Sequence, residues 1–436
     1  MKHAIDRRSF LKTSIAAGTL AMIPSLRGQT EAPRPLKVGI VGCGGRSNHN
    51  LATFMEAAAL LGRPVEIMAI ADCFQDAVDS FAEKFGVPAE RCFTGFDSYR
   101  KVMASDAVFV TMATPPNFRP LHLAAAIEAG KHIFIEKPVA VDAPGCRRVI
   151  ELGELARAKH LAIVAGSQRR HQGNYLRNKA QIDAGAIGKI LGGTVSWNGT
   201  VPWIWERKPE WDDREYLIRN WVNFTEVSGD HIVEQHVHNV DVANWFIGRP
   251  PVSAIGFGGR ARRESGNQFD FFSVDFDYGD GVHIHSQCRQ ISGAYNRVGE
   301  FFRGSEGMTY GGGKLEGREV GIPEVSVLSE DGTIQEMVNL ILAADSPEPI
   351  NEARNIAEST ASTIMGRISA YTGSIVQWSD LMTNAESPYY TMRVGPDPLD
   401  FETGNITLPS ENVIPMPGDG APINRRGVPK PAPGTA

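Results

Sequence analysis

Apolar residues between positions 36 and 168 occur in short continuous runs separated by amphipathic stretches. Continuous apolar runs are typical of strands that are buried on both faces of a sheet. The five runs are 36–42, 65–72, 107–114, 132–138 and 161–168. The stretches between them have helical periodicity, and two end at Gly86 and Gly130, where helix C-caps favour glycine. Alternating strands and helices predict right-handed crossovers and a doubly wound parallel sheet of the α/β class.

After about residue 170 the pattern changes to strand-like runs with few helices. Two of these runs, 269–278 and 282–290, flank a Gly-Asp-Gly turn (279–281), a combination that predicts a β-hairpin. We expect helices at 172–184 and at 351–373, the second closed by a glycine. Many strands with few helices predict a second, α+β domain with a large, mostly antiparallel open sheet.

The N-terminus has a basic head, a short apolar middle and a polar end, the pattern of a targeting signal rather than of a structural helix. Its sequence RRSFLK (7–12) resembles the twin-arginine export signal. That resemblance implies export of an already folded protein, with any cofactor aboard, to the periplasm. The Pro- and Gly-rich C-terminus predicts an extended arm. We therefore divide the chain into a signal peptide (1–33), a nucleotide-binding domain (34–168), an α+β domain (169–393) and the arm (394–436).

Composition narrows the class of protein. The 436 residues are 42% hydrophobic and 22% charged, with a net charge of −6. This balance gives no reason to expect nucleic acid or an anionic membrane as a partner. Beyond the N-terminus no apolar run is long enough for a stable membrane insertion. The five cysteines are widely spaced without a C-x-x-C pair, which favours buried reduced thiols.

A glycine-rich segment, VGIVGCGGRS (38–47), ends the first buried run and precedes a helical stretch. In that context Gly42 permits a tight turn, and Gly44, followed by Gly45, lets the backbone approach a pyrophosphate. The N-terminus of the next helix stabilises the phosphate charge. Ser47 holds the third glycine position of this fingerprint. The segment predicts dinucleotide binding by a Rossmann domain, provided that a second signal supports it.

Asp72, at the end of the second run, is that second signal. A carboxylate there accepts the ribose hydroxyls of NAD and repels the 2′-phosphate of NADP. Arg46 adds a cation close to the expected phosphates. We therefore expect NAD as the cofactor in preference to NADP.

Two further runs end at the same edge of the sheet. Thr114, Pro115 and Asn117 belong to an irregular loop that suits a cofactor crevice. Glu136 and Lys137 follow the next run. A lysine at this position can polarise a substrate hydroxyl. These five residues are expected at the cofactor edge, with Lys137 facing the substrate as well.

The segment GDHIVEQHVHNVD (229–241) holds three histidines and three carboxylates. On one continuous helix, residues three and four apart share a face. That face would carry His231, Glu234, His238 and Asp241, while His236 would point away. Three functions fit: an acid–base site, a metal site, or a buried polar face. Because the spacing is neither H-E-x-x-H nor H-x-x-E-H, and a nicotinamide enzyme needs no Lewis acid, we favour acid–base chemistry without a metal.

The segments 114–142 and 166–171, together with the stretch 229–245, resemble the glucose–fructose oxidoreductase / inositol dehydrogenase / rhizopine catabolism (Gfo/Idh/MocA) family. The likeness extends over roughly residues 36–390. It implies an oxidoreductase with a Rossmann domain, a bound nicotinamide cofactor and a mostly β second domain.

The resemblance also implies residue roles. Lys137 takes the place of the family's catalytic lysine, and His238 that of its catalytic histidine. Glu234 stands where relatives carry an aspartate, and His236 where they carry a glycine. Arg119, which we place among the cofactor residues, stands where relatives often have a histidine. These departures concern the substrate more than the chemistry.

Other polar and aromatic side chains fit a carbohydrate ligand. Sugars present apolar C–H faces and many hydroxyl groups, which tryptophan platforms and charged side chains can bind. Each tryptophan taken singly is equally compatible with core packing. We expect substrate contacts from Arg169, His171, Trp203, Trp205, Trp221, His231 and His236.

Our first hypothesis is an enzyme that moves hydride between tightly bound NAD and a secondary alcohol of a sugar, glycoside or cyclitol. His238 would take the hydroxyl proton, Lys137 would stabilise the alkoxide, and Glu234 would orient them. The alternative is a redox-neutral NAD-dependent glycosidase, which oxidises, eliminates, hydrates and reduces in one site. A third possibility is a non-catalytic sugar-binding protein. By analogy with such open sheets, we expect a homodimer or homotetramer.

Overall fold

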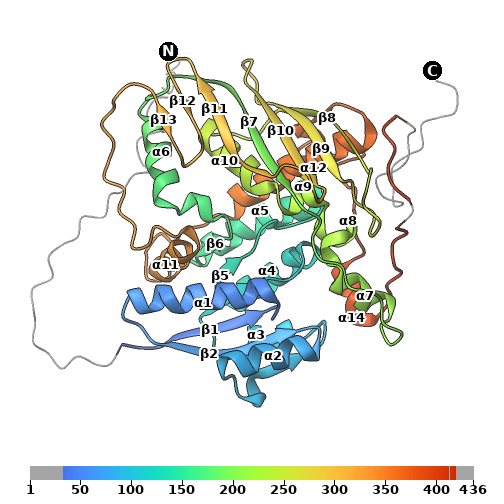
Figure 1. Ribbon diagram of the computed structural model, residues 1–436. Helices are drawn as coiled ribbons and strands as arrows, with labels where there is room; N and C mark the ends of the chain where they lie inside the picture. Colours follow the sequence, from blue (N-terminus) through green and yellow to red (C-terminus); the bar gives the residue numbers. More distant parts are fainter. Residues whose placement is uncertain (1–32, 412, 419–436) are drawn as a thin grey trace, which may run out of the picture. The chain divides into compact units, whose positions relative to one another are not determined.

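The computed structural model describes residues 33–411 and 413–418. Its first sheet has six parallel strands in the order β3-β2-β1-β4-β5-β6 (Figure 1). Their bounds are β1 Leu36–Val41, β2 Val65–Asp72, β3 Cys92–Thr94, β4 Phe109–Met112, β5 His132–Ile135 and β6 Ile163–Ala165. The doubly wound parallel sheet is confirmed, and five strands fall within the predicted runs. The sequence missed β3, because three partly exposed residues at a sheet edge carry no apolar run.

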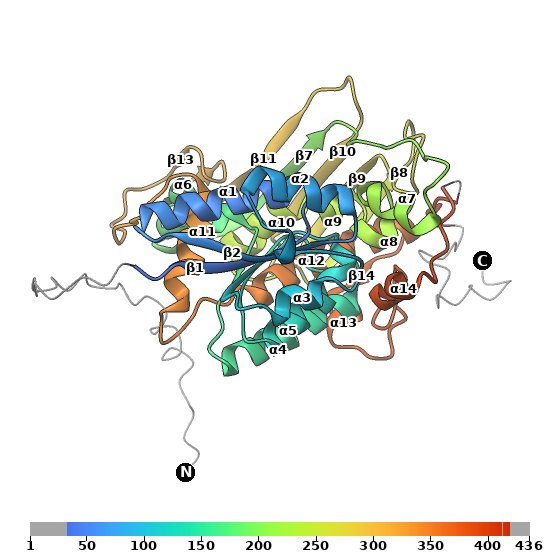
Figure 2. The same cartoon turned by 90° about the horizontal axis from the view of Figure 1, so that it is seen from below.

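Helices cover both faces of this sheet, as Figure 2 shows. One face carries α1 (Gly45–Leu60), α2 (Gln75–Phe85) and α11 (Gly332–Ala344), which share an apolar core with β1. The other face carries α3 (Tyr99–Ala104), α4 (Arg119–Glu128) and α5 (Ala143–Ala158). Gly86 caps α2 with φ +66°, as predicted, whereas Gly130 follows the C-cap of α4 by one residue. The ends of β1, β2, β4 and β5 thus meet at one edge.

The second sheet has eight strands in the order β13-β12-β11-β7-β10-β9-β8-β14. Only the β7–β10 pair is parallel, so the predicted mostly antiparallel sheet is confirmed. The predicted hairpin joins β9 to β10, with positive φ at residues 279, 280 and 281. The bounds are β7 Ile190–Gly199, β8 Ser253–Gly259, β9 Phe271–Asp277, β10 His283–Gln290, β11 Arg297–Gly304, β12 Met308–Thr309, β13 Leu315–Glu316 and β14 Val376–Gln377.

The long helix α12 (Ala353–Thr372) joins the two sheets. It packs against α5 on one side and against β8 and β9 on the other, so a single apolar cluster extends from one sheet to the other. Gly373 caps it with φ +73°, as predicted. The remaining helices are α6 Gly173–Asp183, α7 Asp213–Arg219, α8 Thr225–Ser228, α9 His231–Glu234, α10 Val237–Ile247, α13 Trp378–Met382 and α14 Pro398–Thr403.

The C-terminal arm is more ordered where the structure describes it than its composition indicates. It contains α14, whose Phe401 is fully buried against Phe96 and Phe118. The cysteines are all unpaired, and three of the five are buried. Within the described residues, no helix combines the length and apolar character that crossing a membrane requires. The predicted signal peptide lies outside the described residues, and the domain boundaries remain predictions.

Candidate active site

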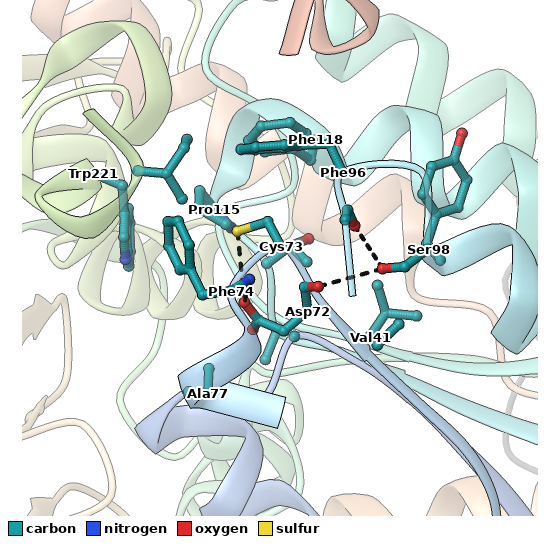
Figure 3. Close-up of a pocket in the computed structure, with 18 of the residues that line it drawn as sticks. Val41, Asp72, Cys73, Phe74, Ala77, Phe96, Ser98, Pro115, Phe118 and Trp221 are labelled. Carbon is teal, nitrogen blue, oxygen red and sulfur yellow. Dashed lines mark hydrogen bonds between the residues drawn. The ribbon is translucent and has the colours of Figure 1, made fainter. Parts of the chain in front are cut away.

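A cavity of about 240 Å³ lies where the ends of β1, β2 and β4 meet. We call it the Asp72 pocket. Figure 3 shows Asp72 and Phe74 among the residues that line it, together with Trp221 from a distant segment. The Asp72 carboxylate accepts hydrogen bonds from the main-chain N–H groups of Cys43 (2.7 Å) and Phe74 (3.0 Å). Burial nevertheless raises the pKa of Asp72, because the loss of hydration of the carboxylate outweighs these hydrogen bonds.

The glycine segment forms the turn predicted for it. Gly42 has φ +90°, and a Cβ there would lie 3.2 Å from the Ala113 carbonyl carbon, so only glycine fits. A Cβ at Gly44 or Gly45 would meet nothing within 4 Å, so the space beside these residues is open. Helix α1 starts at Gly45 with no acidic residue in its first turn. These features fit the pyrophosphate of a dinucleotide.

Two other residues of the glycine segment, Ser47 and Arg46, differ in their contacts. The Ser47 hydroxyl is buried and has no hydrogen-bond partner among the described residues. The Arg46 guanidinium, about half exposed, lies 3.6 Å from the Glu136 carboxylate. Glu136 also accepts from Asn50 Nδ2 (3.1 Å). Glu136 therefore connects α1 to the end of β5 through Arg46 and Asn50.

The loop after β4 is held by buried side chains. Arg119 Nε donates to the Thr114 carbonyl (2.9 Å), and its Nη1 donates to the Pro138 carbonyl. Burial lowers the pKa of Arg119 to about 10. Asn117 Nδ2 donates to the Pro396 carbonyl (3.1 Å) of the arm. Arg119 and Asn117, both expected to bind the cofactor, therefore bond to main-chain carbonyls. Thr114 and its neighbour Pro115 line the Asp72 pocket.

The segment 229–241 forms two helices, which corrects the single helix that the sequence predicted. In a continuous helix His238 N–H would donate to the Glu234 carbonyl. Here His238 N–H turns to the Gln235 carbonyl (3.5 Å), and Lys137 Nζ donates to the Glu234 carbonyl (2.6 Å). Lys137 Nζ also lies 3.1 Å from Glu234 Oε1. The break between α9 and α10 thus provides the lysine with a main-chain acceptor.

His238 lies beside this pair. Its ring stacks on the Trp197 ring, with centroids 5.6 Å apart and planes at 20°. No described residue forms a hydrogen bond with the His238 ring. Burial, and then the positive charges of Lys137 and Arg169, hold the pKa of His238 well below its usual range. The ring is therefore neutral near pH 7 and able to accept a proton.

An ion pair adjoins the histidine on the sheet side. Arg169 Nη1 lies 2.7 Å from Glu300 Oε1, and Glu300 also accepts from Tyr175 Oη (3.0 Å) and Asn239 Nδ2 (2.7 Å). The Arg169 guanidinium lies 5.9 Å from the Trp197 ring centre. We call Lys137, Glu234 and His238, together with Trp197, Arg169 and Glu300, the Lys137 cluster.

The sequence did not identify Trp197 or Glu300 as site residues. Both lie on strands, Trp197 on β7 and Glu300 on β11, within runs that predict only a sheet. A glutamate pointing to the covered face of an open sheet is unusual, because charged residues are seldom fully buried without a partner. The sequence VGEFF (298–302) contains this glutamate, but the sequence does not show which face of the strand is covered, so Glu300 could not be identified as buried.

Other predicted substrate residues contact protein groups. His171 Nε2 lies 3.3 Å from Glu352, and its Nδ1 lies 2.8 Å from Asn339 Nδ2. His231 Nδ1 lies 3.0 Å from Asp230, and His236 Nε2 lies 2.7 Å from Ser286 Oγ. All three rings are buried. The structure does not bring them into the Lys137 cluster, and His236, unexplained by the sequence, joins α10 to β10.

The three predicted tryptophans gather at the other end of the site. Trp205 and Trp221 line the Asp72 pocket, and Trp203 stands edge-on to Trp221 with ring centroids 6.3 Å apart. They lie together with Asp72 rather than in the Lys137 cluster. Among the described residues, no group of three or more His, Cys, Asp or Glu side chains is arranged to hold a metal ion.

Two models of one protein family match this chain, one in each of its two sheet-containing regions. Residues 36–166 match the model GFO_IDH_MocA, described as "Oxidoreductase family, NAD-binding Rossmann fold". Residues 175–309 match the model described as "GFO/IDH/MocA C-terminal domain". The match to the first model supports NAD as the cofactor of the Rossmann domain.

Individual relatives agree with this assignment. The chain is 36% identical to inositol 2-dehydrogenase 3 of Saccharopolyspora erythraea over 170 residues, 38% of this chain and 46% of that protein. It is 31% identical to inositol 2-dehydrogenase of Salmonella typhimurium over 215 residues, 49% of this chain and 54% of that protein. The chain thus spans about half the length of the curated relatives it matches.

A solved structure supports the fold as well. Scyllo-inositol dehydrogenase from Lactobacillus casei superimposes with a TM-score of 0.60 at 17% identity, covering 80% of this chain and 99% of that one. At this identity the likeness establishes the arrangement of the two sheets and not the substrate.

Proposed function

The chain belongs to the Gfo/Idh/MocA oxidoreductase family, and on that premise we propose that it is an NAD-dependent oxidoreductase of an uncharged sugar, glycoside or cyclitol. The observation that carries the proposal is the Lys137–Glu234 pair beside the neutral, unbonded ring of His238. This cluster adjoins the strand-end edge that also carries Asp72 and the glycine turn. Bound NAD supplies the hydride acceptor for a secondary alcohol, or the donor for its ketone.

The chain's own residues handle the proton and the oxygen. A neutral His238 ring takes the proton of the substrate hydroxyl at its unbonded nitrogen. The Lys137 ammonium stabilises the negative charge that develops on the oxygen. The Glu234 carbonyl and carboxylate hold that ammonium in position. In the reverse direction the same groups return the proton to the ketone oxygen.

Charge balance supports an uncharged substrate. Lys137 is paired with Glu234, Arg169 with Glu300, and the neighbouring Arg170 with Asp241 through two bonds of 2.8 and 2.9 Å. A sugar acid or sugar phosphate would meet these carboxylates without an unpaired cation to bind it. A neutral ring with several hydroxyl groups finds acceptors in the carboxylates and a flat apolar face in Trp197.

The redox-neutral glycosidase is not favoured, because the relatives described above are named as dehydrogenases. The test separates the two reactions directly. Purified protein is denatured to identify its cofactor, then assayed with myo-inositol, neutral monosaccharides and aryl glycosides for keto product and for released aglycone. We expect NAD and a keto product. Aglycone release without net reduction of NAD would replace this proposal with the glycosidase.

Substitutions test the assigned roles. Lys137→Ala and His238→Ala should each remove turnover, while NAD still co-purifies with the protein. A fully active His238→Ala variant would refute the assignment of the base. Loss of NAD together with turnover would instead indicate a structural role for the altered residue.

We further propose export through the twin-arginine pathway to the periplasm, with NAD tightly bound. The motif at residues 7–12 supports it, and tight binding would be required where no nicotinamide pool exists. An Arg7→Lys/Arg8→Lys variant should stay in the cytoplasm, as fractionation would show. Homodimer or homotetramer formation through the second sheet is supported by Ile255 and Phe257, which are exposed on one strand. Sedimentation analysis of Phe257→Glu would test it.

A further inference from the structure

We propose that residues 203–221, which we call the clamp, close over the adenosine end of NAD and set the rate at which the cofactor leaves. The inference rests on the proposed NAD dependence and goes beyond it. The clamp begins 131 residues after Asp72 (203 − 72), yet four of its side chains line the same pocket. These four are Trp205, Ile218, Arg219 and Trp221.

The chemistry of the pocket walls suits a purine nucleoside. Phe74 and Phe96 on the first-sheet side and Trp221 on the clamp present aromatic surfaces (Figure 3). Trp205 of the clamp lines the same pocket. Aromatic rings stack on nucleobases with little dependence on hydrogen bonding. Asp72 provides the acceptor that ribose hydroxyls require. Because two of the six Phe, Tyr and Trp side chains that line the pocket, Trp205 and Trp221, come from the clamp, the adenosine site is complete only while the clamp is closed.

A bidentate ion pair fastens the clamp to the first sheet's helix α2. Arg219 Nη1 and Nη2 each lie 3.1 Å from an oxygen of Asp76. The Arg219 guanidinium also lies 4.1 Å from the Phe74 ring centre, and its Nε bonds to Glu215 (2.8 Å) within the clamp. Arg219 thus connects the clamp to α2 by its ion pair with Asp76 on the other side of the pocket.

The arm supports the clamp from behind. Arg214 Nη1 donates to the Phe401 carbonyl (2.9 Å), and Asp213 accepts from Leu408 N–H (3.3 Å). The outer side chains Trp203 and Trp205 are 49% and 57% exposed. The inner part of the clamp is also held by an apolar cluster in which Leu217 and Ile218 pack with Phe401. Its outer edge at Trp203 and Trp205 buries little apolar surface, so opening that edge costs less than unfolding the whole clamp.

Cofactor release tests the clamp without relying on activity. The rate of NADH dissociation is measured by fluorescence after mixing the loaded protein with excess unlabelled NAD. We expect Asp76→Asn to accelerate release by about two- to fivefold, because the Asp76 side chain is 66% exposed, and Trp221→Ala by more, since it removes an aromatic wall of the pocket. The affinity for ADP-ribose should fall in parallel, whereas that for nicotinamide mononucleotide, which lacks adenosine, should not change.

Glu330→Gln is the matched control. It removes half of another bidentate pair, Arg177–Glu330 (3.1 and 2.9 Å), that does not line the Asp72 pocket. Its release rate should equal that of the wild type. Unchanged release in both Asp76→Asn and Trp221→Ala would overturn the clamp while leaving the NAD dependence intact. A wild-type protein that binds neither NADH nor ADP-ribose would overturn the proposed cofactor, and the clamp with it.

Discussion

The Asp72 pocket and the Lys137 cluster lie at the same edge of the first sheet but differ in the polarity of their side chains. Aromatic and aliphatic side chains dominate the pocket, and Asp72 is its main charged group toward the first sheet. The cluster instead contains two buried ion pairs around one imidazole. Shape and stacking therefore provide binding at the first end, whereas fixed charges provide chemistry at the second.

This difference predicts which substitutions affect turnover and which affect cofactor retention. A buried ion pair loses far more when one partner is removed than when a rim contact is removed. Changes in the cluster should reduce kcat, and changes in the pocket should alter cofactor retention. Arg119 bonds to the loop at the pocket and to Pro138 beside Lys137, so it alone among the residues discussed should affect both ends.

The largest expected effect is that of Lys137→Ala. Removing the ammonium takes away the group that stabilises the developing negative charge, which should lower kcat by about 10³- to 10⁴-fold. Steady-state rates with the best substrate measure this loss. The rate of NADH release should equal that of the wild type, and accelerated release would show that the two ends are not separate.

Arg119→Met should affect both ends through stability. It leaves the carbonyls of Thr114 and Pro138 without donors, which should lower the free energy of unfolding by about 2–4 kcal/mol. Urea unfolding followed by tryptophan fluorescence measures this change. Both kcat and cofactor retention should fall together. A variant with wild-type stability would contradict the role of Arg119 as the link.

Glu300→Gln tests whether the balanced charges of the Lys137 cluster determine the preference for an uncharged substrate. A neutral glutamine leaves the Arg169 cation uncompensated, so kcat/KM for a uronic acid relative to its neutral sugar should rise by about tenfold. Asp76→Asn, which frees Arg219 at the other end, is the control and should leave that ratio unchanged. No change in the ratio for Glu300→Gln would show that Arg169 does not face the substrate.

The smallest effect concerns pH. Burial and neighbouring cations lower the pKa of His238 below its ordinary value of 6.5, so the ring stays a neutral base as the pH falls below 6.5. The acid limb of kcat/KM should therefore lie below pH 6.5. Because the unfolded chain binds this proton more readily, unfolding free energy should decrease as pH falls below 6.5, and less steeply in His238→Gln. An acid limb above pH 6.5 would contradict this arrangement.

Continuous apolar runs and local glycine chemistry made the first sheet predictable. The positions of Gly42 and Asp72 at strand ends could be predicted from these runs, and their cofactor roles stay predictions that follow from those positions. Lys137 and His238 were brought together correctly, but only through a family resemblance. The break at Gln235 could not be predicted, because it depends on bonds from Lys137, Ser286 and Gln290 that are distant in sequence.

For the three tryptophans predicted to bind a sugar, the sequence indicated the chemistry of the side chains but not their location. Residues Trp203, Trp205 and Trp221 have the chemistry that both a pyranose and an adenine accept. Their position relative to Asp72 depends on how the segment after β7 crosses to the first sheet. That crossing is held by Arg219 and Asp76, a pair 143 residues apart that no local pattern connects.

Because Lys137 donates to the main-chain carbonyl of Glu234, the site can tolerate a change of side chain at position 234. Main-chain oxygen is present whatever side chain occupies position 234, so the ammonium of Lys137 keeps one acceptor through any substitution that preserves the backbone. A lineage can therefore exchange aspartate for glutamate here, and adjust substrate preference, without first losing the lysine's anchorage. The resemblance implies an aspartate at this position in relatives, and the glutamate of this chain is compatible with such a tolerance.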